Sequence, residues 1–134
     1  MFSESPIEIR PNSPVTDEQL NELFIAAWPG HRRRSFRPVF AASLAYLCAF
    51  AGERLVGYVN VAWDGCTHAF LLDPTVLPEF RRRGIGRRLV RQAVEAARDR
   101  GVTWVHVDYV PELREFYARC GFQRTEAGLI CLAK

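Results

Sequence analysis

The 134-residue sequence lacks most features that mark membrane, secreted and metal-binding proteins. No run approaches the roughly 18 to 20 uninterrupted apolar residues that a membrane-spanning helix needs. The first residues, MFSESPIEIRPNSP, show neither the basic nor the apolar region of a secretion signal. Four cysteines are present, but no two form a CxxC pair, which disfavours both a zinc site and a disulfide framework. These absences predict a metal-free cytoplasmic protein, without a membrane partner, whose thiols stay reduced.

Lysine is also scarce, since Lys134 is the single lysine among 18 basic residues. The charge is unevenly divided: residues 1–80 carry six arginines against nine acids, whereas residues 81–134 carry twelve basic residues against six acids. The second part is therefore strongly basic and favours an anionic ligand. Its arginines are densest over eleven residues, at Arg81, Arg82, Arg83, Arg87, Arg88 and Arg91.

The length and composition predict one globular domain spanning residues 1–134. Chains of about 100 to 150 residues typically build a single core. Apolar residues make up 49% of the chain and charged residues 25%, which disfavours wholesale disorder.

The first part of the chain alternates strand and helix signals. A short strand is expected at Ile7–Arg10, and Thr16-Asp17-Glu18-Gln19 has the T-x-x-Q form of a capping box that opens a helix through Ala27. A second, short helix is expected over about 37–44, with Pro38 in its first turn. The β-rich runs 46–50, 55–63 and 67–76 then predict an antiparallel meander.

From Ile85 the apolar period becomes helical, and Gly101 ends the helix. The apolar run 103–107 predicts a strand buried between layers, followed by a short helix over 113–120 and closing strands at 122–125 and 129–132. Because residues 67–107 read strand, helix, strand, the two strands should be parallel. The predicted fold is α/β (α+β), with a mixed, mostly antiparallel sheet of six to seven strands and about four flanking helices.

The turn at 78–89 has the chemistry of a phosphate site. Gly84 and Gly86 leave the backbone bare at the start of a helix, whose N-terminal amides and dipole attract anions. The dinucleotide motif GxGxxG fails because Leu89 holds the third glycine position, and no lysine completes a P-loop. A solvated, arginine-rich helix start is the alternative.

The segment Val76-Leu77-Pro78-Glu79-Phe80-Arg81-Arg82-Arg83-Gly84-Ile85-Gly86 resembles the R/Q-x-x-G-x-G/A acyl-CoA-binding motif of the GNAT superfamily of N-acetyltransferases. Phe116-Tyr117-Ala118-Arg119-Cys120-Gly121-Phe122 is similar to the F-Y-x-x-x-G-F segment of the same family. The resemblance implies a central pair of parallel strands that splay apart, with acetyl-CoA between them and a primary amine of a small molecule or protein as acceptor. It also makes a homodimer possible.

By this resemblance, the pantetheine arm pairs with the backbone at Val76 and Leu77, and Thr75 or Val76 holds the acyl oxygen because Pro74 lacks an N–H. The diphosphate lies on the glycine and arginine turn. The implied cofactor-binding residues are Thr75, Val76, Leu77, Arg81, Arg82, Arg83, Gly84, Ile85, Gly86, Arg87 and Arg88.

Two catalytic roles are expected. The resemblance implies that Tyr117 gives a proton to the departing thiolate, although the helical spacing of Leu113, Phe116, Tyr117 and Cys120 also fits a packed core residue. Asp73 is the first candidate for the base that deprotonates the amine, with a turn-forming role for Asp73-Pro74 as the alternative. A water chain could replace that base.

Several features leave the function open. Asp108, His68 and His106 are weaker candidates for the base, and Arg32-Arg33-Arg34 is either a solvated loop or a contact for an acidic substrate. Two other functions remain: a non-catalytic acyl-CoA sensor, and an arginine-rich nucleic-acid-binding module, which the scarcity of interleaved aromatics disfavours.

Overall fold

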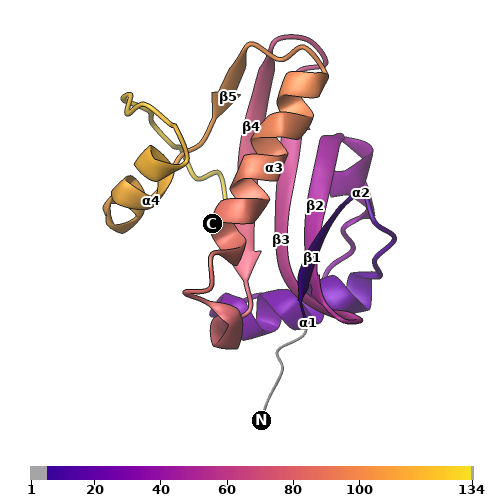
Figure 1. Cartoon of the computed structure of the whole chain (residues 1–134). Helices are drawn as coiled ribbons and strands as arrows, with labels where there is room; N and C mark the ends of the chain where they lie inside the picture. The colour runs from indigo at the N-terminus through magenta and orange to yellow at the C-terminus, as the bar shows by residue number, and fades with distance from the viewer. Residues whose placement is uncertain (1–5, 134) are drawn as a thin grey trace.

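The computed structural model describes residues 6–133 and builds them around one five-stranded sheet of order β1-β2-β3-β4-β5. Neighbouring strands are antiparallel except β4 and β5, which are parallel (Figure 1). The strands are β1 (Ile7–Pro11), β2 (Ser43–Ala51), β3 (Arg54–Trp63), β4 (His68–Val76) and β5 (Trp104–His106). The helices are α1 (Asp17–Ala27), α2 (Arg37–Ala41), α3 (Ile85–Asp99) and α4 (Arg114–Arg119), with 3₁₀ turns η1 (Pro78–Phe80) and η2 (Pro111–Leu113).

Helices cover both faces of the sheet. Successive residues of β3 point to opposite faces, so neighbouring residues meet different helices. Gly57 faces α3: a Cβ there would lie 2.9 Å from Leu89 Cδ1 and 3.3 Å from Ile85 Cγ2, so only glycine lets the helix approach this closely. Tyr58 faces the other way, where its ring packs against Phe24 of α1, 5.6 Å between centroids. The fold class predicted from the sequence is therefore confirmed.

The two long helices begin and pack as their sequences predict. Thr16 caps α1 through a complete capping box, in which its hydroxyl accepts from Gln19 N at 3.1 Å and Gln19 Oε1 accepts from Thr16 N at 2.9 Å. The apolar stripe of α3 lies against β2, β3 and β4, with the side chains of Ile85, Leu89, Val90, Ala93 and Ala97 all buried. None of the helices in residues 6–133 is long and apolar enough to cross a membrane.

Strand β4 is irregular in two ways: it has a bulge opposite β3, and it pairs with β5 over only part of its length. Between Leu72 and Thr75 the register with β3 shifts, so that Asp73 and Pro74 bulge out of the ladder, and Asp73 takes a φ of 51°. β4 pairs with β5 only from His68 to Phe70. Beyond that point the two parallel strands separate, as the resemblance implied.

The structure corrects the prediction for the last part of the chain. β5 covers three residues rather than five, and Trp104 is 62% exposed, so this strand is not buried between layers. Residues 122–125 and 129–132 form no strand, and the described sheet has five strands instead of six or seven. The second helix is also shorter than expected, ending at Ala41. The sequence 122–132 has the residue types of a strand, but no other segment of residues 6–133 pairs with it.

Candidate acyl-CoA site

A cleft of about 660 Å³ opens where β4 leaves β5. Three elements form its walls: the end of β4, the turn that enters α3, and α4. The end of α1 closes it. Its lining residues are Ala27, Trp28, Pro74, Thr75, Val76, Phe80, Arg81, Arg82, Gly84, Ile85, Gly86, Arg87, Leu113, Phe116, Tyr117 and Arg119.

The N-terminus of α3 offers its backbone amides to this cleft. Arg88 N is the first to join the helical ladder, through a 3.1 Å bond to Gly84 O, so the amides from Gly84 to Arg87 precede it. No side chain caps them, whereas Thr16 caps α1. Because such amides carry the positive end of the helix dipole, the uncapped end is suited to bind a phosphate.

Left-handed backbone shapes this turn. Arg82 has a φ of 65° and Gly84 a φ of 80°, and alternation of this kind turns successive N–H groups toward one concave surface. A Cβ on Gly84 would meet no atom within 4 Å, so glycine is required there for its backbone conformation. A Cβ on Gly86 would lie 3.6 Å from Phe116 Cζ, in ordinary contact with the opposite wall. The turn thus fits a diphosphate held by main-chain groups.

The arginines of the turn have different environments. Arg81 Nε donates to Val76 O at 3.3 Å, while Arg83 donates to Glu79 O at 3.2 Å and stacks on Phe80 at 4.8 Å. Arg88 points away and donates to Ile7 O of β1 at 3.0 Å. Arg82 and Arg87 are exposed and line the cleft. Arg81 and Arg119 also line the cleft, so its positive charge comes from four exposed arginines.

Tyr117 is the buried residue of α4. Its ring stacks on Tyr109 at 4.9 Å and packs edge-on against Phe116 and Phe122 at 4.9 and 5.8 Å. Only 3% of the residue is exposed, yet it lines the cleft. Burial, followed by the proximity of Cys120 and Asp108, raises the pKa of Tyr117 to about 12. The hydroxyl therefore stays protonated at neutral pH and can serve as a donor.

Hydrogen bonds from Trp28, at the end of α1, and from Thr75 hold the bulge of β4 in place. Trp28 Nε1 donates to Thr75 Oγ1 at 2.9 Å, and this hydroxyl donates to Asp73 O at 2.8 Å. Trp28 thus holds the end of α1 against the strand that lines the cleft. The Asp73 side chain is exposed and does not line the cleft itself.

The loop that carries Arg32, Arg33 and Arg34 is rigidly held. The buried amide of Asn21 donates to Arg34 O at 2.8 Å and accepts from Arg34 N at 3.0 Å. His31 Nε2 lies 2.9 Å from the same amide oxygen. All three arginines are exposed on this loop, which follows Trp28 directly.

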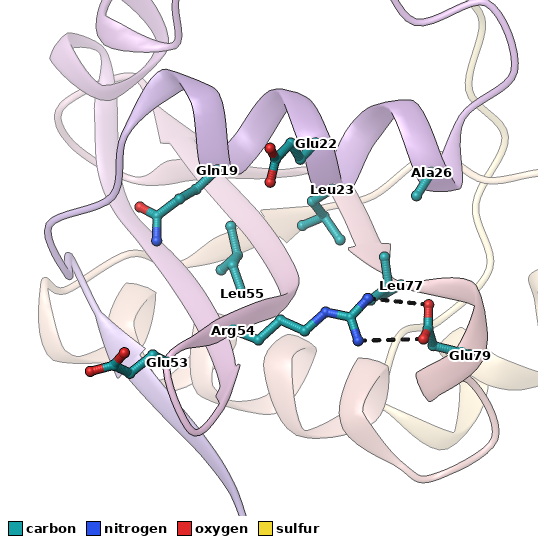
Figure 2. Close-up of a pocket in the computed structure, with 9 residues that line it drawn as sticks. All are labelled: Gln19, Glu22, Leu23, Ala26, Glu53, Arg54, Leu55, Leu77 and Glu79. Carbon is teal, nitrogen blue, oxygen red and sulfur yellow. Dashed lines mark hydrogen bonds and ion pairs between the residues drawn. The ribbon is translucent and has the colours of Figure 1, made fainter.

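A second, smaller groove of about 300 Å³ lies between α1 and the β2–β3 hairpin (Figure 2). In Figure 2 the Arg54 guanidinium lies beside Glu79, with two N–O distances of 3.4 Å. Both side chains are more than half exposed, so the pair contributes less than about 1 kcal/mol. It links β3 to η1, which begins the turn that enters α3.

The remaining titratable candidates lie elsewhere. His68 Nδ1 and His106 Nε2 are 2.7 Å apart where β4 and β5 pair, and neither residue lines the cleft. Among residues 6–133, no three His, Cys, Asp or Glu side chains gather to hold a metal ion. All four cysteines are free thiols.

Comparison with known proteins agrees with this geometry. The family model for the acetyltransferase (GNAT) family matches residues 15–122. The chain belongs to the GNAT acetyltransferase family. A 50-residue stretch, 37% of this chain, is 55% identical to glucosamine 6-phosphate N-acetyltransferase 1 of Oryza sativa subsp. japonica, but it covers only 30% of that protein.

Solved structures of other GNAT proteins share the fold over almost the whole chain. A GNAT family acetyltransferase from Streptococcus pneumoniae TIGR4 superposes with a TM-score of 0.81 at 24% identity, covering 96% of this chain and 99% of that one. The aminoglycoside N-acetyltransferase AAC(6')-Iy, in complex with CoA, gives 0.75 at 22% identity over 100% of this chain and 99% of its own. At these identities the likeness concerns the fold alone.

In this GNAT protein the cleft brings together most residues expected from the sequence. Thr75, Val76, Arg81, Arg82, Gly84, Ile85, Gly86, Arg87 and Tyr117 line it, whereas Leu77, Arg83, Arg88 and Asp73 do not. Leu77 is buried, and its amide donates to Val56 O at 2.8 Å.

Sequence reasoning missed several residues of the cleft. Trp28 lines the cleft, whereas the nearby aromatic residues Phe36 and Phe40 pack in or against the core, and no local sequence pattern separates the three. Phe116 precedes Tyr117 in the segment 116–122 that resembles the family pattern, so this stretch already carried a signal. Its ring lies opposite Gly86. Arg119 and Phe80 carry no sequence signal of their own.

Proposed function

We propose that the protein is an N-acetyltransferase that moves an acetyl group from acetyl-CoA to a primary amine by direct attack of the amine on the thioester. The observation that carries this proposal is the uncapped N-terminus of α3, whose amides face a cleft that also contains Tyr117 and ends at the β4 bulge. Acetyl-CoA supplies the activated acyl group. We assign the N-terminus of α3 to its diphosphate, the edge of β4 that β5 leaves open to its amides, and the Tyr117 hydroxyl to its sulfur.

Each residue then has a role. The amides from Gly84 to Arg87, with Arg82 and Arg87, hold the diphosphate. The edge of β4 at Val76 is free of β5 and can pair with the pantetheine amides. Thr75 or Val76 offers its amide to the acyl oxygen, and Tyr117 donates to the thiolate as it leaves. Asp73 is our candidate for the base, acting directly or through water.

We further propose that the acceptor is a small amine with a negative charge. The exposed arginines of the loop at 32–34 follow Trp28, which borders the cleft, and Asn21 holds this loop in place. The similarity to proteins named for glucosamine 6-phosphate makes amino-sugar phosphates the first class to test.

Binding is tested by thermal unfolding. CoA or acetyl-CoA at a hundred times its Kd should add about 2.7 kcal/mol to the free energy of unfolding. For a chain of this size that raises Tm by about 10 °C. Pantetheine at the same concentration, which has the amide arm without the diphosphate, should give a much smaller shift. Equal shifts with both ligands, or none with CoA, would contradict the assignment of the turn.

Turnover is tested by the release of free thiol from acetyl-CoA in a panel of amines. We expect release with at least one primary amine, and a higher kcat/KM for phosphorylated or carboxylated amines than for neutral ones. The advantage of anionic acceptors should shrink as salt increases. CoA binding without release for any amine in the panel would instead support an acyl-CoA sensor.

A further inference from the structure

Tyr58 of β3 is the largest fully buried side chain among residues 6–133, yet its hydroxyl forms no hydrogen bond with any of them. The hydroxyl of Tyr46, on the neighbouring strand β2, donates to Ser13 O at 2.8 Å. The buried hydroxyl of Thr75 has two partners. Buried polar groups in native proteins almost always have a hydrogen-bond partner. The Tyr58 hydroxyl therefore points to a partner from outside the chain.

Aromatic neighbours hold the Tyr58 ring in one orientation. Its centroid lies 5.6 Å from that of Phe24, 6.3 Å from that of Phe36 and 6.5 Å from that of Phe40. The contacts with Phe24 and Phe36 are edge-on, an arrangement that aromatic pairs prefer. Because the hydroxyl lies on the long axis of the ring, its position is fixed together with the ring.

The hydroxyl of Tyr58 reaches a narrow opening. Each fully enclosed side-chain nitrogen or oxygen of the described residues has a hydrogen-bond partner. The unpartnered oxygen of Tyr58 is therefore not fully enclosed, and the 1% of the residue that stays exposed lies at this atom. Such an opening can be reached by a single small polar group, such as an amine or a water molecule.

This opening lies beside the proposed reaction centre. Tyr58 pairs with Thr75 across the β3–β4 ladder, immediately before the bulge that contains Asp73 and Pro74. Residues directly opposite each other in an antiparallel pair have their side chains on the same face of the sheet. Here it is the face that α1 covers, whereas α3, with the amides proposed for the diphosphate, packs on the other face. A second substrate that approaches the thioester from the α1 face meets the Tyr58 hydroxyl.

Two charged side chains lie near the hydroxyl. Burial, followed by the negative charge of Asp73, raises the pKa of Tyr58, and the Arg34 guanidinium acts in the opposite direction. Arg34 belongs to the loop that Asn21 holds, and its guanidinium stacks on the Phe36 ring at 4.5 Å. A carboxylate and a guanidinium near a neutral hydroxyl suit an acceptor that carries both an amine and an anionic group.

We propose that the Tyr58 hydroxyl binds the acceptor amine, accepting a hydrogen bond from its N–H and holding the nitrogen beside Asp73 for attack on the thioester. This inference rests on the proposed function. In the transfer, the amine nitrogen bonds to the acyl carbon, the carbon–sulfur bond breaks, and its electron pair leaves on sulfur. The amine proton passes to Asp73 or to water. Tyr58 neither gains nor loses a proton.

Kinetics of Tyr58→Phe test the proposal, with glucosamine 6-phosphate as the first acceptor and, after it, any amine from which the wild type releases thiol. The value of kcat/KM for the amine should fall at least about tenfold, since the lost hydrogen bond is made to a nitrogen that gains positive charge. The KM for acetyl-CoA and the Kd for CoA should stay unchanged. The control Tyr46→Phe removes a hydroxyl from β2, away from β4, and should keep wild-type kinetics.

Thermal unfolding separates this role from a structural one. Tyr58→Phe removes a hydroxyl without a partner in the chain and should leave Tm unchanged or slightly higher. Tyr46→Phe loses its bond to Ser13 O and should lower Tm by about 2–6 °C. An equal loss of Tm in both variants would show that the chain itself binds the Tyr58 hydroxyl, which overturns the proposal.

The kinetic outcomes distinguish the two proposals. If the wild type acetylates an amine and Tyr58→Phe does so with the same kcat/KM, the hydroxyl binds no more than water. That result overturns the role of Tyr58 and leaves the proposed function intact. If the wild type binds CoA but releases thiol with no amine, the proposed function fails, and the role of Tyr58 fails with it.

Discussion

Replacing Tyr117 with phenylalanine is expected to lower kcat about a hundredfold, which is the low end of the effect of losing one hydrogen-bond donor to charge that develops in the transition state. The phenylalanine ring keeps the packing against Phe116 and Phe122, so the fold and the Kd for CoA should change little. Steady-state kinetics with an acceptor from the thiol-release panel measures kcat, and thermal shifts with CoA measure binding. A variant with kcat near wild type would remove Tyr117 from the reaction.

Tyr109→Phe is the matched control. Tyr109 stacks directly on Tyr117 and loses the same hydroxyl in the variant, but it does not line the cleft. Its kcat should therefore stay near the wild-type value. A similar loss in both variants would mean that the aromatic packing of α4, rather than the Tyr117 hydroxyl, controls the rate.

The raised pKa of Tyr117 defines how the hydroxyl can act. At about 12 it lies well above the pKa of about 8.5 typical of a thiol, so complete proton transfer to the thiolate is unfavourable by about three orders of magnitude. A hydrogen bond that strengthens as charge develops on sulfur is consistent with this difference. Since the donor form persists throughout neutral and moderately alkaline pH, Tyr117→Phe should lower kcat by the same factor at every pH below about 10.

Gly84→Ala is expected to weaken CoA binding by about 10- to 100-fold. Alanine at a φ of 80° costs about 1–2 kcal/mol, and relief of that strain rotates the amides of residues 84 and 85 away from the ligand. Each hydrogen bond from an amide to a charged phosphate contributes about 1.5–3 kcal/mol, and one such bond lost corresponds to that range of affinity. Calorimetric titration with CoA gives the Kd directly.

Gly52→Ala is the control that separates the loss of folding stability, caused by alanine at a positive φ, from the loss of CoA affinity. Gly52 lies in the β2–β3 hairpin with a φ of 63°, and a Cβ there, as at Gly84, meets nothing within 4 Å. Both variants should lose similar stability, with Tm lower by about 4–8 °C, because both force alanine into the left-handed region. Only the variant at position 84 should lose affinity. If Gly84→Ala binds CoA as tightly as Gly52→Ala does, the turn does not hold the diphosphate.

Elements determined by local chemistry were predictable from the sequence. The capping box of α1 needs four adjacent residues, and the apolar stripe of α3 repeats within one helix. All the residues that define either pattern therefore lie close together in the sequence. The glycine and arginine turn is local in the same sense, and its position at the N-terminus of α3 could be predicted with its chemistry.

Features that depend on distant segments were not predictable. The sequence 129–132 has strand propensity, but propensity does not say which edge the segment will pair with, and in the described chain it pairs with none. Trp28 meets Thr75 across 47 positions, and Arg88 meets Ile7 across 81. Arg87 and Arg88 are the same residue type at adjacent positions of α3, yet Arg87 lines the cleft while Arg88 donates to Ile7 O, a partner that lies 81 positions away.

The close approach at Gly57 has a consequence for recognition. Because α3 rests against β3 through Ile85 and Leu89, in the same first two turns that carry the amides we propose for the phosphate, the orientation of those amides is set when the core forms. An arriving anion therefore meets donors already aligned and loses little affinity to ordering them. Core packing and ligand affinity are thereby linked. A methyl group added at Gly57 would push α3 away from β3 and turn the amides at its N-terminus out of alignment.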